Sequence, residues 1–216
     1  LGRGGSDYSA ALLAEVLNAQ DVLIWTDVAG IYTTDPRIVS NAQRIDTMSF
    51  SEAAEMATFG AKVLHPATLL PAVRSNIPVY VGSSKAPQDG GTWVTRNPQP
   101  RPTFRAIDLR RDQTLLTLSS LNMLHAQGFL ANIFTILAKH KISVDTITTS
   151  EVSVALTLDK TGSASSGASL LSEELLRELS EFCTVKVDVG LSLIALIGNE
   201  LHTASGVAKR IFETLD

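Results

Sequence analysis

A stretch rich in glycine and proline, residues 83–102, divides the chain into two halves with different patterns. It holds two glycines and four prolines among polar residues. Proline removes a backbone donor and fixes φ, so neither a helix nor a central strand tolerates such a composition. The stretch therefore predicts a boundary, with one domain over 1–95, a linker over 96–112 and a second folded region after it.

The first half alternates helical and extended patterns. The run Val22–Trp25 is short and continuously apolar, which is typical of a strand buried on both faces. Ser49 and Glu52 have the spacing of a helix capping box. The remaining expected elements are helices over 10–17 and from Pro66 through Leu70, and a strand over 78–81. The pattern predicts an α/β fold in which helices cover apolar strands.

The second half has the element order βαββαβ. The expected elements are strands over 114–119, 142–148, 152–158 and 184–189, and helices over 129–139 and 170–181. One helical stripe and one strictly alternating strand indicate a sheet with helices on one face, so an α+β, ferredoxin-like domain is predicted over 113–189. Residues 190–216 repeat the strand–loop–helix opening, so we expect the start of a second, truncated copy there.

Composition excludes several classes of protein. The formal charge is -4 and no Lys/Arg cluster occurs, which argues against a nucleic-acid or anionic-membrane surface. No run approaches the roughly 18 apolar residues of a membrane span. Cys183 is alone, so no intrachain disulfide is possible, and a reducing, cytoplasmic compartment is expected. The chain opens inside a glycine-rich loop and stops just after a helical pattern, so both ends are expected to be cut.

A glycine-rich loop precedes the first predicted helix. The segment Gly2–Asp7 would present backbone N–H groups at a helix N-terminus, where a phosphate or carboxylate is stabilised. It lacks the Gly-Lys-Ser/Thr of a Walker loop, and Asp7 stands where a dinucleotide fingerprint needs its third glycine. A tight turn capped by Ser6 or Asp7 is the alternative.

Four further residues suggest a nucleotide. Asp27 follows a buried strand, at the end where open α/β sheets place ligands. Tyr32 and Arg37 offer an aromatic face and a guanidinium, which suit a base and its phosphates. Lys62 could place a compact charge on a phosphate. A solvated loop acid and a surface lysine are the alternatives for Asp27 and Lys62.

Three segments, 3–7, 25–37 and 59–66, are similar to three successive motifs of the aspartate kinases, in the same order and spacing. The resemblance implies the C-terminal part of an amino-acid-kinase domain of the αβα sandwich type. It assigns one set of residues to aspartate, namely Arg3, Gly4, Gly5, Ser6 and Asp7. It assigns another set to ATP, namely Thr26, Asp27, Tyr32, Arg37, Lys62 and Val63.

The implied chemistry is transfer of the ATP γ-phosphoryl group to the side-chain carboxylate of L-aspartate. Positioning and charge neutralisation dominate such reactions. Arg37 and Lys62 would balance phosphate charge together with Mg²⁺, and Asp7 would orient substrate or metal. The Lys-Phe-Gly-Gly-Thr-Ser segment that opens this family, with its catalytic lysine, is absent. We therefore expect the chain alone to lack kinase activity.

The second half resembles the ACT domain, a sensor of amino acids. Segments 121–130 and 143–152 look like the two lysine-contacting segments of lysine-sensitive aspartate kinases. The resemblance assigns lysine contacts to Met123, Ala126, Phe129, Leu130, Ser143, Val144, Asp145, Ser150 and Glu151. Such sensors bind where two ACT domains meet, which implies a homodimer.

The charges of that second half suit a ligand with two ammonium groups. Asp145 and Glu151 can accept from ammonium groups, and the helix entered through Gly128 suits a carboxylate. We expect both acids to face one pocket beside Gly128. The alternative is that both are strand-end acids facing water.

Two other functions remain open from the sequence. One is a non-catalytic amino-acid-binding regulator, which the retention of Asp27, Arg37 and Lys62 disfavours. The other is a kinase for another carboxylate or for a nucleoside phosphate, which the lysine-type segments disfavour. The four histidines have no ligand spacing, and no metal-binding residues are predicted.

Overall fold

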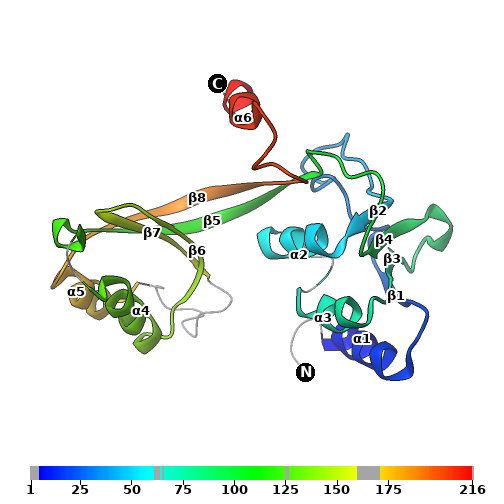
Figure 1. Cartoon of the computed structure of the whole chain (residues 1–216), viewed down its shortest axis with the longest axis horizontal. Coiled ribbons are helices and arrows are strands. Elements are labelled where there is room, and N and C mark those ends of the chain that lie inside the picture. Colours follow the sequence, from blue (N-terminus) through cyan, green and yellow to red (C-terminus); the bar gives the residue numbers. More distant parts are fainter. Residues whose placement is uncertain (1–4, 61–63, 65, 125–126, 160–170, 216) are drawn as a thin grey trace. The chain divides into compact units, whose positions relative to one another are not determined.

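The computed structural model describes residues 5–60, 64, 66–124, 127–159 and 171–215 (Figure 1). The chain divides into two compact units. Unit 1 comprises Leu1–Arg110 and Ile194–Asp216, and unit 2 comprises Arg111–Leu193. No helix within the described residues is both long and apolar enough to span a bilayer.

Unit 1 is built on a four-stranded mixed sheet with helices on it (Figure 1). The strand order is β1-β3-β4-β2, with β1 and β3 parallel, β3 and β4 antiparallel, and β2 and β4 parallel. The strands are β1 Val22–Thr26, β2 Thr47–Ser49, β3 Val79–Ser83 and β4 Gly91–Thr95, and the helices are α1 Gly5–Leu17, α2 Phe50–Phe59 and α3 Pro66–Ser75.

The hydrophobic core of unit 1 lies on one face of this sheet. Val22 and Ile24 of β1 join residues of α1, α2 and α3 in a single buried cluster. The alternate residues Leu23 and Trp25 are 50% and 47% exposed. The prediction of a strand buried on both faces is therefore wrong for the described residues, because the three helices contribute to the same core. On the other face Tyr80 packs between Trp25 and Trp93, with ring centroids 5.7 and 5.0 Å away.

The glycine- and proline-rich stretch does not end unit 1. β4 lies in that stretch and is an interior strand of the sheet, paired with both β3 and β2. The prolines at 87 and 98 flank it, and residues 91–95 contain none, so its backbone donors are intact. A short 3-10 helix over Pro87–Asp89 also lies in the stretch. Unit 1 continues to Arg110, and β5 begins at Ala106, inside the predicted linker.

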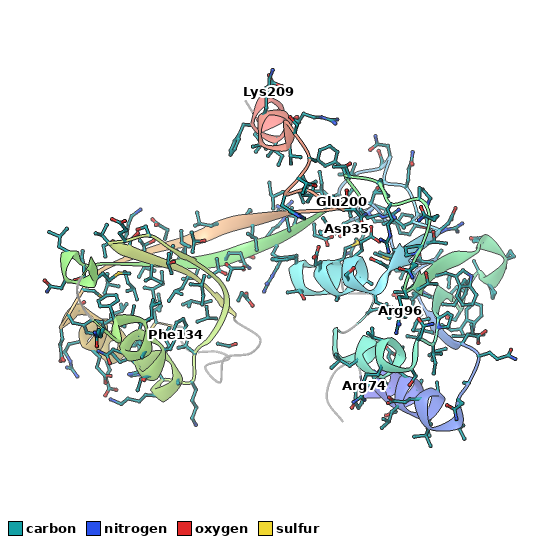
Figure 2. The ribbon with its side chains drawn as sticks, in the orientation of Figure 1. Asp35, Arg74, Arg96, Phe134, Glu200 and Lys209 are labelled. Atoms are coloured by element: carbon teal, nitrogen blue, oxygen red, sulfur yellow. The ribbon has the colours of Figure 1, made fainter. Side chains whose placement is uncertain are left out.

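Unit 2 has the predicted βαββαβ order, with a sheet arranged β6-β7-β5-β8. Its elements are β5 Ala106–Ser119, a 3-10 helix Leu121–Leu124, α4 Phe129–Lys139, β6 Ser143–Thr149, β7 Ser153–Asp159, α5 Glu173–Ser180 and β8 Thr184–Ile197. Leu116, Ile133 and Leu175 lie in one core cluster that joins β5, β7, α4 and α5. Figure 2 labels Phe134 of α4, which packs against the same cluster.

The C-terminal segment differs from the expectation of one strand over 184–189 and a new strand that opens the segment 190–216. β8 runs without interruption from Thr184 to Ile197, and Gly190 within it has a φ of 70°. α6, Val207–Leu215, is the helix that the apolar periodicity predicts. Residues from Ile194 onward group with unit 1. The second, truncated copy over 190–216 stays a prediction.

Candidate functional site

The nucleotide-side residues begin at the carboxyl ends of β1 and β3. Both the backbone N–H and the side-chain hydroxyl of Ser84 donate to the Thr26 carbonyl, at 2.8 and 2.9 Å. Asp27 is exposed and its carboxylate accepts from the Thr26 hydroxyl at 3.2 Å. Because β1 and β3 are parallel, their ends share one edge of the sheet, where open α/β sheets bind ligands.

The loop from Gly30 to Arg37 is fixed mainly through its backbone. The Ile45 N–H donates to the Ile31 carbonyl at 2.8 Å, and Tyr32 pairs with Arg44 in an antiparallel bridge. The Thr33 N–H donates to the Gln43 carbonyl, and the Ile107 N–H donates to the Thr33 carbonyl, each at 2.8 Å. The position of Tyr32 therefore follows from segments distant in the sequence.

Arg37 is paired with Asp35 on the same loop (Figure 2 labels Asp35). Its guanidinium donates twice to the carboxylate, from Nε at 2.9 Å and from Nη2 at 2.7 Å. The side-chain and backbone hydrogen bonds from Arg37 lower the pKa of Asp35 below its ordinary value. The Arg37 side chain is 85% exposed, so its remaining donors are open to an incoming anion.

The glycine-rich loop is partly helical. α1 begins at Gly5, five residues before the predicted start at residue 10. Ser6 and Asp7 therefore belong to its first turn. The first N–H groups of a helix have no partner within the helix, so this turn retains the donors expected for a carboxylate or phosphate. The Ser6 hydroxyl donates to the Asp7 carboxylate at 3.2 Å. Four assigned residues of unit 1 lie outside the described residues, namely Arg3, Gly4, Lys62 and Val63.

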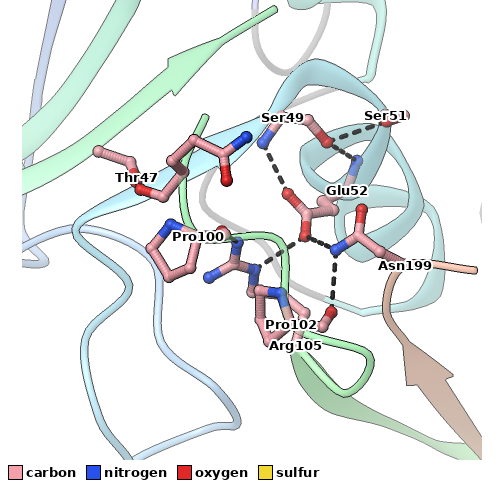
Figure 3. Close-up of polar contacts among 9 residues, drawn as sticks. Thr47, Ser49, Ser51, Glu52, Pro100, Pro102, Arg105 and Asn199 are labelled. Atoms are coloured by element: carbon pink, nitrogen blue, oxygen red, sulfur yellow. Dashed lines mark hydrogen bonds and ion pairs between the residues drawn. The ribbon is translucent and has the colours of Figure 1, made fainter. Parts of the chain in front are cut away.

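A buried carboxylate on α2 connects segments that the sequence does not link (Figure 3). Glu52 accepts from Arg105 Nε and from Asn199 Nδ2, each at 2.8 Å, and from the Ser49 N–H at 2.7 Å. Asn199 Nδ2 also donates to the Pro102 carbonyl at 3.0 Å. The capping box was readable from Ser49 and Glu52, whereas these longer-range partners had no sequence signal.

The surroundings of Glu52 stabilise its charged form. The side chains of Glu52 and Arg105 are only 3% and 9% exposed. Burial is the largest single influence and raises the pKa of Glu52, but the hydrogen bonds from Arg105, Ser49 and Asn199 outweigh it and lower the pKa. Glu52 is therefore a charged anchor for α2, whose other end leads toward Lys62 in the sequence.

Part of the lysine-side set in unit 2 belongs to the core. Phe129 is 8% exposed and meets Phe182 edge to face at a centroid distance of 5.5 Å. Met123 and Val144 pack against the same cluster. Leu130 is 40% exposed, and Ala126 lies outside the described residues. Met123 and Val144 keep partial exposure, and Leu130 is the most exposed of these apolar residues in the part of the chain that the structure describes.

The two acids of the lysine-side set lie at opposite ends of β6. Asp145 falls where the β6–β7 register shifts, between the pairs Val144↔Leu158 and Thr146↔Thr157. Glu151 lies in the exposed turn after β6. At about 3.3 Å per residue, the backbone of the stretch 145–149 alone spans roughly 13 Å. The expectation that both acids of one chain face one pocket stays a prediction.

The turn that carries Glu151 is well connected. The Ser150 N–H donates to the Ser153 carbonyl, and the two serine hydroxyls bond each other, both at 2.8 Å. The Ser120 N–H donates to the Val152 carbonyl at 2.9 Å, which places this turn beside the segment leading into α4. Ser143 pairs with Asp159 at the other end of β6, near Asp145.

A shallow cavity of about 260 Å³ lies away from all these residues. It is lined by Phe50, Asn76, Pro78, Thr95, Arg96 and Asn97. Pro78 precedes β3 and Thr95 ends the antiparallel β4, so the cavity is at the opposite ends of the strands from Thr26 and Asp27. It contributes nothing to the candidate site.

Comparison with known proteins extends over the whole chain. Residues 1–83 match the amino acid kinase family. The chain is 69% identical over 216 residues to the lysine-sensitive aspartokinase 3 of Escherichia coli, covering 100% of this chain and 48% of that protein. The chain therefore spans about half the length of this relative.

Two solved structures of the Escherichia coli aspartokinase III are similar over 100% of this chain and 48% of theirs. One is in complex with aspartate and ADP in the R-state, with a TM-score of 0.88 at 69% identity. The other is in complex with lysine and aspartate in the T-state, with a TM-score of 0.86 at 68% identity. The mixed α/β fold described above thus matches that of aspartokinase structures.

Proposed function

We propose that this chain is the nucleotide-side part of an aspartate kinase joined to a lysine-sensing regulatory region. The intact enzyme would phosphorylate L-aspartate to 4-phospho-L-aspartate with ATP, at the start of lysine, threonine and methionine biosynthesis, and lysine would inhibit it. The observation that carries the proposal is the 69% identity over the whole chain to a lysine-sensitive aspartokinase. A cytoplasmic location, without nucleic acid or membrane as partner, follows from the composition.

The described residues suit the charge of a nucleotide. The phosphates would lie at the sheet edge formed by Thr26 and Asp27, with Tyr32 beside the base and Arg37 beside the phosphates. Lys62 and Val63 would complete the ATP side. Arg37 is already oriented by its paired bonds to Asp35, which reduces the ordering needed on binding.

Aspartate would bind at the first turn of α1. Its carboxylate suits the free N–H groups there and the side chains of Arg3 and Ser6, with Gly4 and Gly5 leaving room for the approach. Asp7 would orient the substrate or the metal. These roles fit the half-buried position of Asp7 within that turn.

Mg²⁺ would be held mainly by the nucleotide phosphates. Among the described residues, no group of three or more His, Cys, Asp or Glu side chains could hold a metal by itself. Mg²⁺ in phosphoryl-transfer sites commonly uses one or two carboxylates plus phosphate oxygens. The ion would neutralise phosphate charge during transfer.

Calorimetry with ADP and Mg²⁺ tests the nucleotide assignment. We expect the chain to bind ADP, because the residues assigned to the nucleotide are present. Arg37→Ala should weaken ADP binding, while Arg96→Ala, at the distant cavity, should not. A chain that binds no ADP would contradict the proposal.

The regulatory proposal is a ferredoxin-like ACT domain that binds lysine between two copies of the chain. The β6-β7-β5-β8 sheet with α4 and α5 on one face supports it. Asp145 and Glu151 of one chain lie toward opposite ends of β6. A single lysine that contacts one Asp145 and one Glu151 would therefore contact Asp145 of one chain and Glu151 of the other. Lysine would then favour one arrangement of a homodimer and so shift the population toward an inactive state.

Glu151→Ala tests this assignment directly. The side chain is exposed, so its removal should abolish lysine binding in calorimetry without unfolding the chain. Glu181→Ala, another exposed acid of unit 2, is the matched control and should leave lysine binding intact. Unchanged lysine affinity in Glu151→Ala would remove Glu151 from the site.

A further inference from the structure

A buried hydroxyl holds the base of the nucleotide-side loop. Thr92, on β4, is 0% exposed. Its Oγ1 accepts a hydrogen bond from the Ile31 N–H at 2.8 Å and donates to the Ile45 carbonyl at 2.6 Å. A hydroxyl has one donor and two acceptor positions, so this single group satisfies one backbone donor and one backbone acceptor at once.

The two backbone groups that Thr92 bonds belong to opposite arms of the loop. Ile31 directly precedes Tyr32, and Ile45 directly follows Arg44, the residue that pairs with Tyr32. Both isoleucines are nearly fully buried. Water therefore has little access to replace the hydroxyl, and an unpartnered backbone group at this depth is unfavourable.

The backbone beside the hydroxyl leaves no space for a side chain at residue 30. Gly30 has a φ of 106°, and a Cβ at that position would lie 2.6 Å from Thr92 Oγ1 and 3.0 Å from the Thr92 nitrogen. The loop thus approaches β4 as closely as a glycine allows. The Gly30 conformation and the Thr92 hydroxyl define one position for the start of the loop.

We propose that Thr92 is a positioning residue for the nucleotide: its hydroxyl sets the backbone from which Tyr32 and Arg37 project. The inference rests on the proposed function, because it takes the loop to be a nucleotide-binding element. Thr92 itself touches neither Tyr32 nor Arg37 through its hydroxyl and acts through the backbone of Ile31 and Ile45. Thr92 fixes the position of the loop backbone, and small displacements of that backbone weaken nucleotide binding.

The experiment compares ADP binding by the full chain and by three variants, in calorimetry with Mg²⁺. Thr92→Val keeps the shape but removes the hydroxyl, and we expect ADP to bind about tenfold more weakly, which corresponds to about 1.4 kcal/mol. Thr92→Ser keeps the hydroxyl and should bind within about twofold of the original chain. Thr95→Val, on the same strand and away from the loop, is the matched control and should bind ADP normally.

The outcomes separate this inference from the proposed function. A chain that binds no ADP overturns both. A chain that binds ADP, with Thr92→Val binding equally well, overturns the role of Thr92 alone. A merely structural role would lower the melting temperature of Thr92→Val and Thr92→Ser without the affinity difference between them. If Thr92→Val does not fold, Thr92→Ala, which also lacks the hydroxyl, takes its place with the same expected loss.

Discussion

Two regions of the molecule were assigned to ligands, and they are organised differently. One is the loop from Gly30 to Arg37 in unit 1, and the other is strand β6 with the turn that follows it in unit 2. The N–H groups of Ile45 and Ile107 donate to the loop backbone, and the Thr92 hydroxyl accepts from it, so the loop is held from within one unit. In unit 2, the two acids lie at opposite ends of an edge strand. In the functions proposed above, the first site would be preorganised inside one chain, whereas the second would be completed by a second chain.

The largest expected difference concerns one acid from each unit. Glu52→Ala leaves Arg105 buried without its carboxylate, so it should lower the free energy of unfolding by about 3–5 kcal/mol. Glu151→Ala removes an exposed side chain and should change that free energy by less than about 0.5 kcal/mol. Urea denaturation of both variants measures the contrast. Equal losses in the free energy of unfolding would show that the buried hydrogen bonds of Glu52 add no more stability than an exposed acid does.

The next effect depends on pH and on a second buried acid of unit 1. Asp108 is 7% exposed, its Oδ2 has no hydrogen-bond partner, and burial raises the pKa of its carboxyl to about 6. The pKa of Asp108 is higher in the folded chain than in the unfolded chain. The carboxyl therefore contributes to the free energy of unfolding below about pH 4, and this contribution is lost as pH rises through 6. Asp108→Asn should therefore exceed the original chain in stability above about pH 7, by roughly 2–3 kcal/mol.

Urea denaturation at several pH values measures that advantage. It should shrink toward zero as the pH falls well below 3.8, because the original carboxyl is then protonated in both the folded and the unfolded chain. Glu52 has the opposite sign: its lowered pKa gives a contribution that is present at neutral pH and lost as pH falls. An Asp108→Asn advantage independent of pH would contradict the assignment of the effect to this carboxyl.

A smaller effect compares two glycines with positive φ. A Cβ on Gly30 would meet Thr92, whereas a Cβ on Gly190, in β8, would meet nothing within 4 Å. Gly30→Ala should weaken ADP binding about tenfold or more, because the loop must move. Gly190→Ala should cost only about 1–2 kcal/mol of backbone strain and leave ADP binding unchanged. Calorimetry decides, and equal ADP affinities would mean that the loop adapts freely.

The smallest expected effect is a dependence on chain concentration. If two chains complete the lysine site, dilution below the dimerisation constant should weaken apparent lysine affinity by a few-fold, as mass action requires. ADP affinity should stay constant over the same dilution series. Equilibrium dialysis at several chain concentrations measures both. A lysine affinity that does not change on dilution to monomer would place the whole site within one chain.

Elements with strong local signals were predictable from the sequence. The apolar stripe from Phe129 gives α4 the predicted bounds 129–139, and the capping box of α2 occurs as expected. Both depend on residues a few positions apart, so the sequence alone contains the information. The second-half order βαββαβ was predictable for the same reason.

Features that depend on distant residues were not predictable. Arg105 lies 53 positions from its partner Glu52, and Asn199 lies 147 positions from the same partner. No periodicity connects these residues. β4 was hidden because the composition of its flanks resembles a linker. The separation of Asp145 from Glu151 follows from strand length and from the register shift at Asp145, which a segment resemblance does not convey.

The aromatic row formed by Trp25, Tyr80 and Trp93 has a spectroscopic consequence. Both tryptophans and all three tyrosines of the chain belong to unit 1, while the aromatic residues of unit 2 are phenylalanines only. Ultraviolet-excited emission therefore reports on unit 1 alone. A denaturation curve followed by intrinsic fluorescence is blind to unit 2, whose melting needs far-ultraviolet circular dichroism or an introduced chromophore.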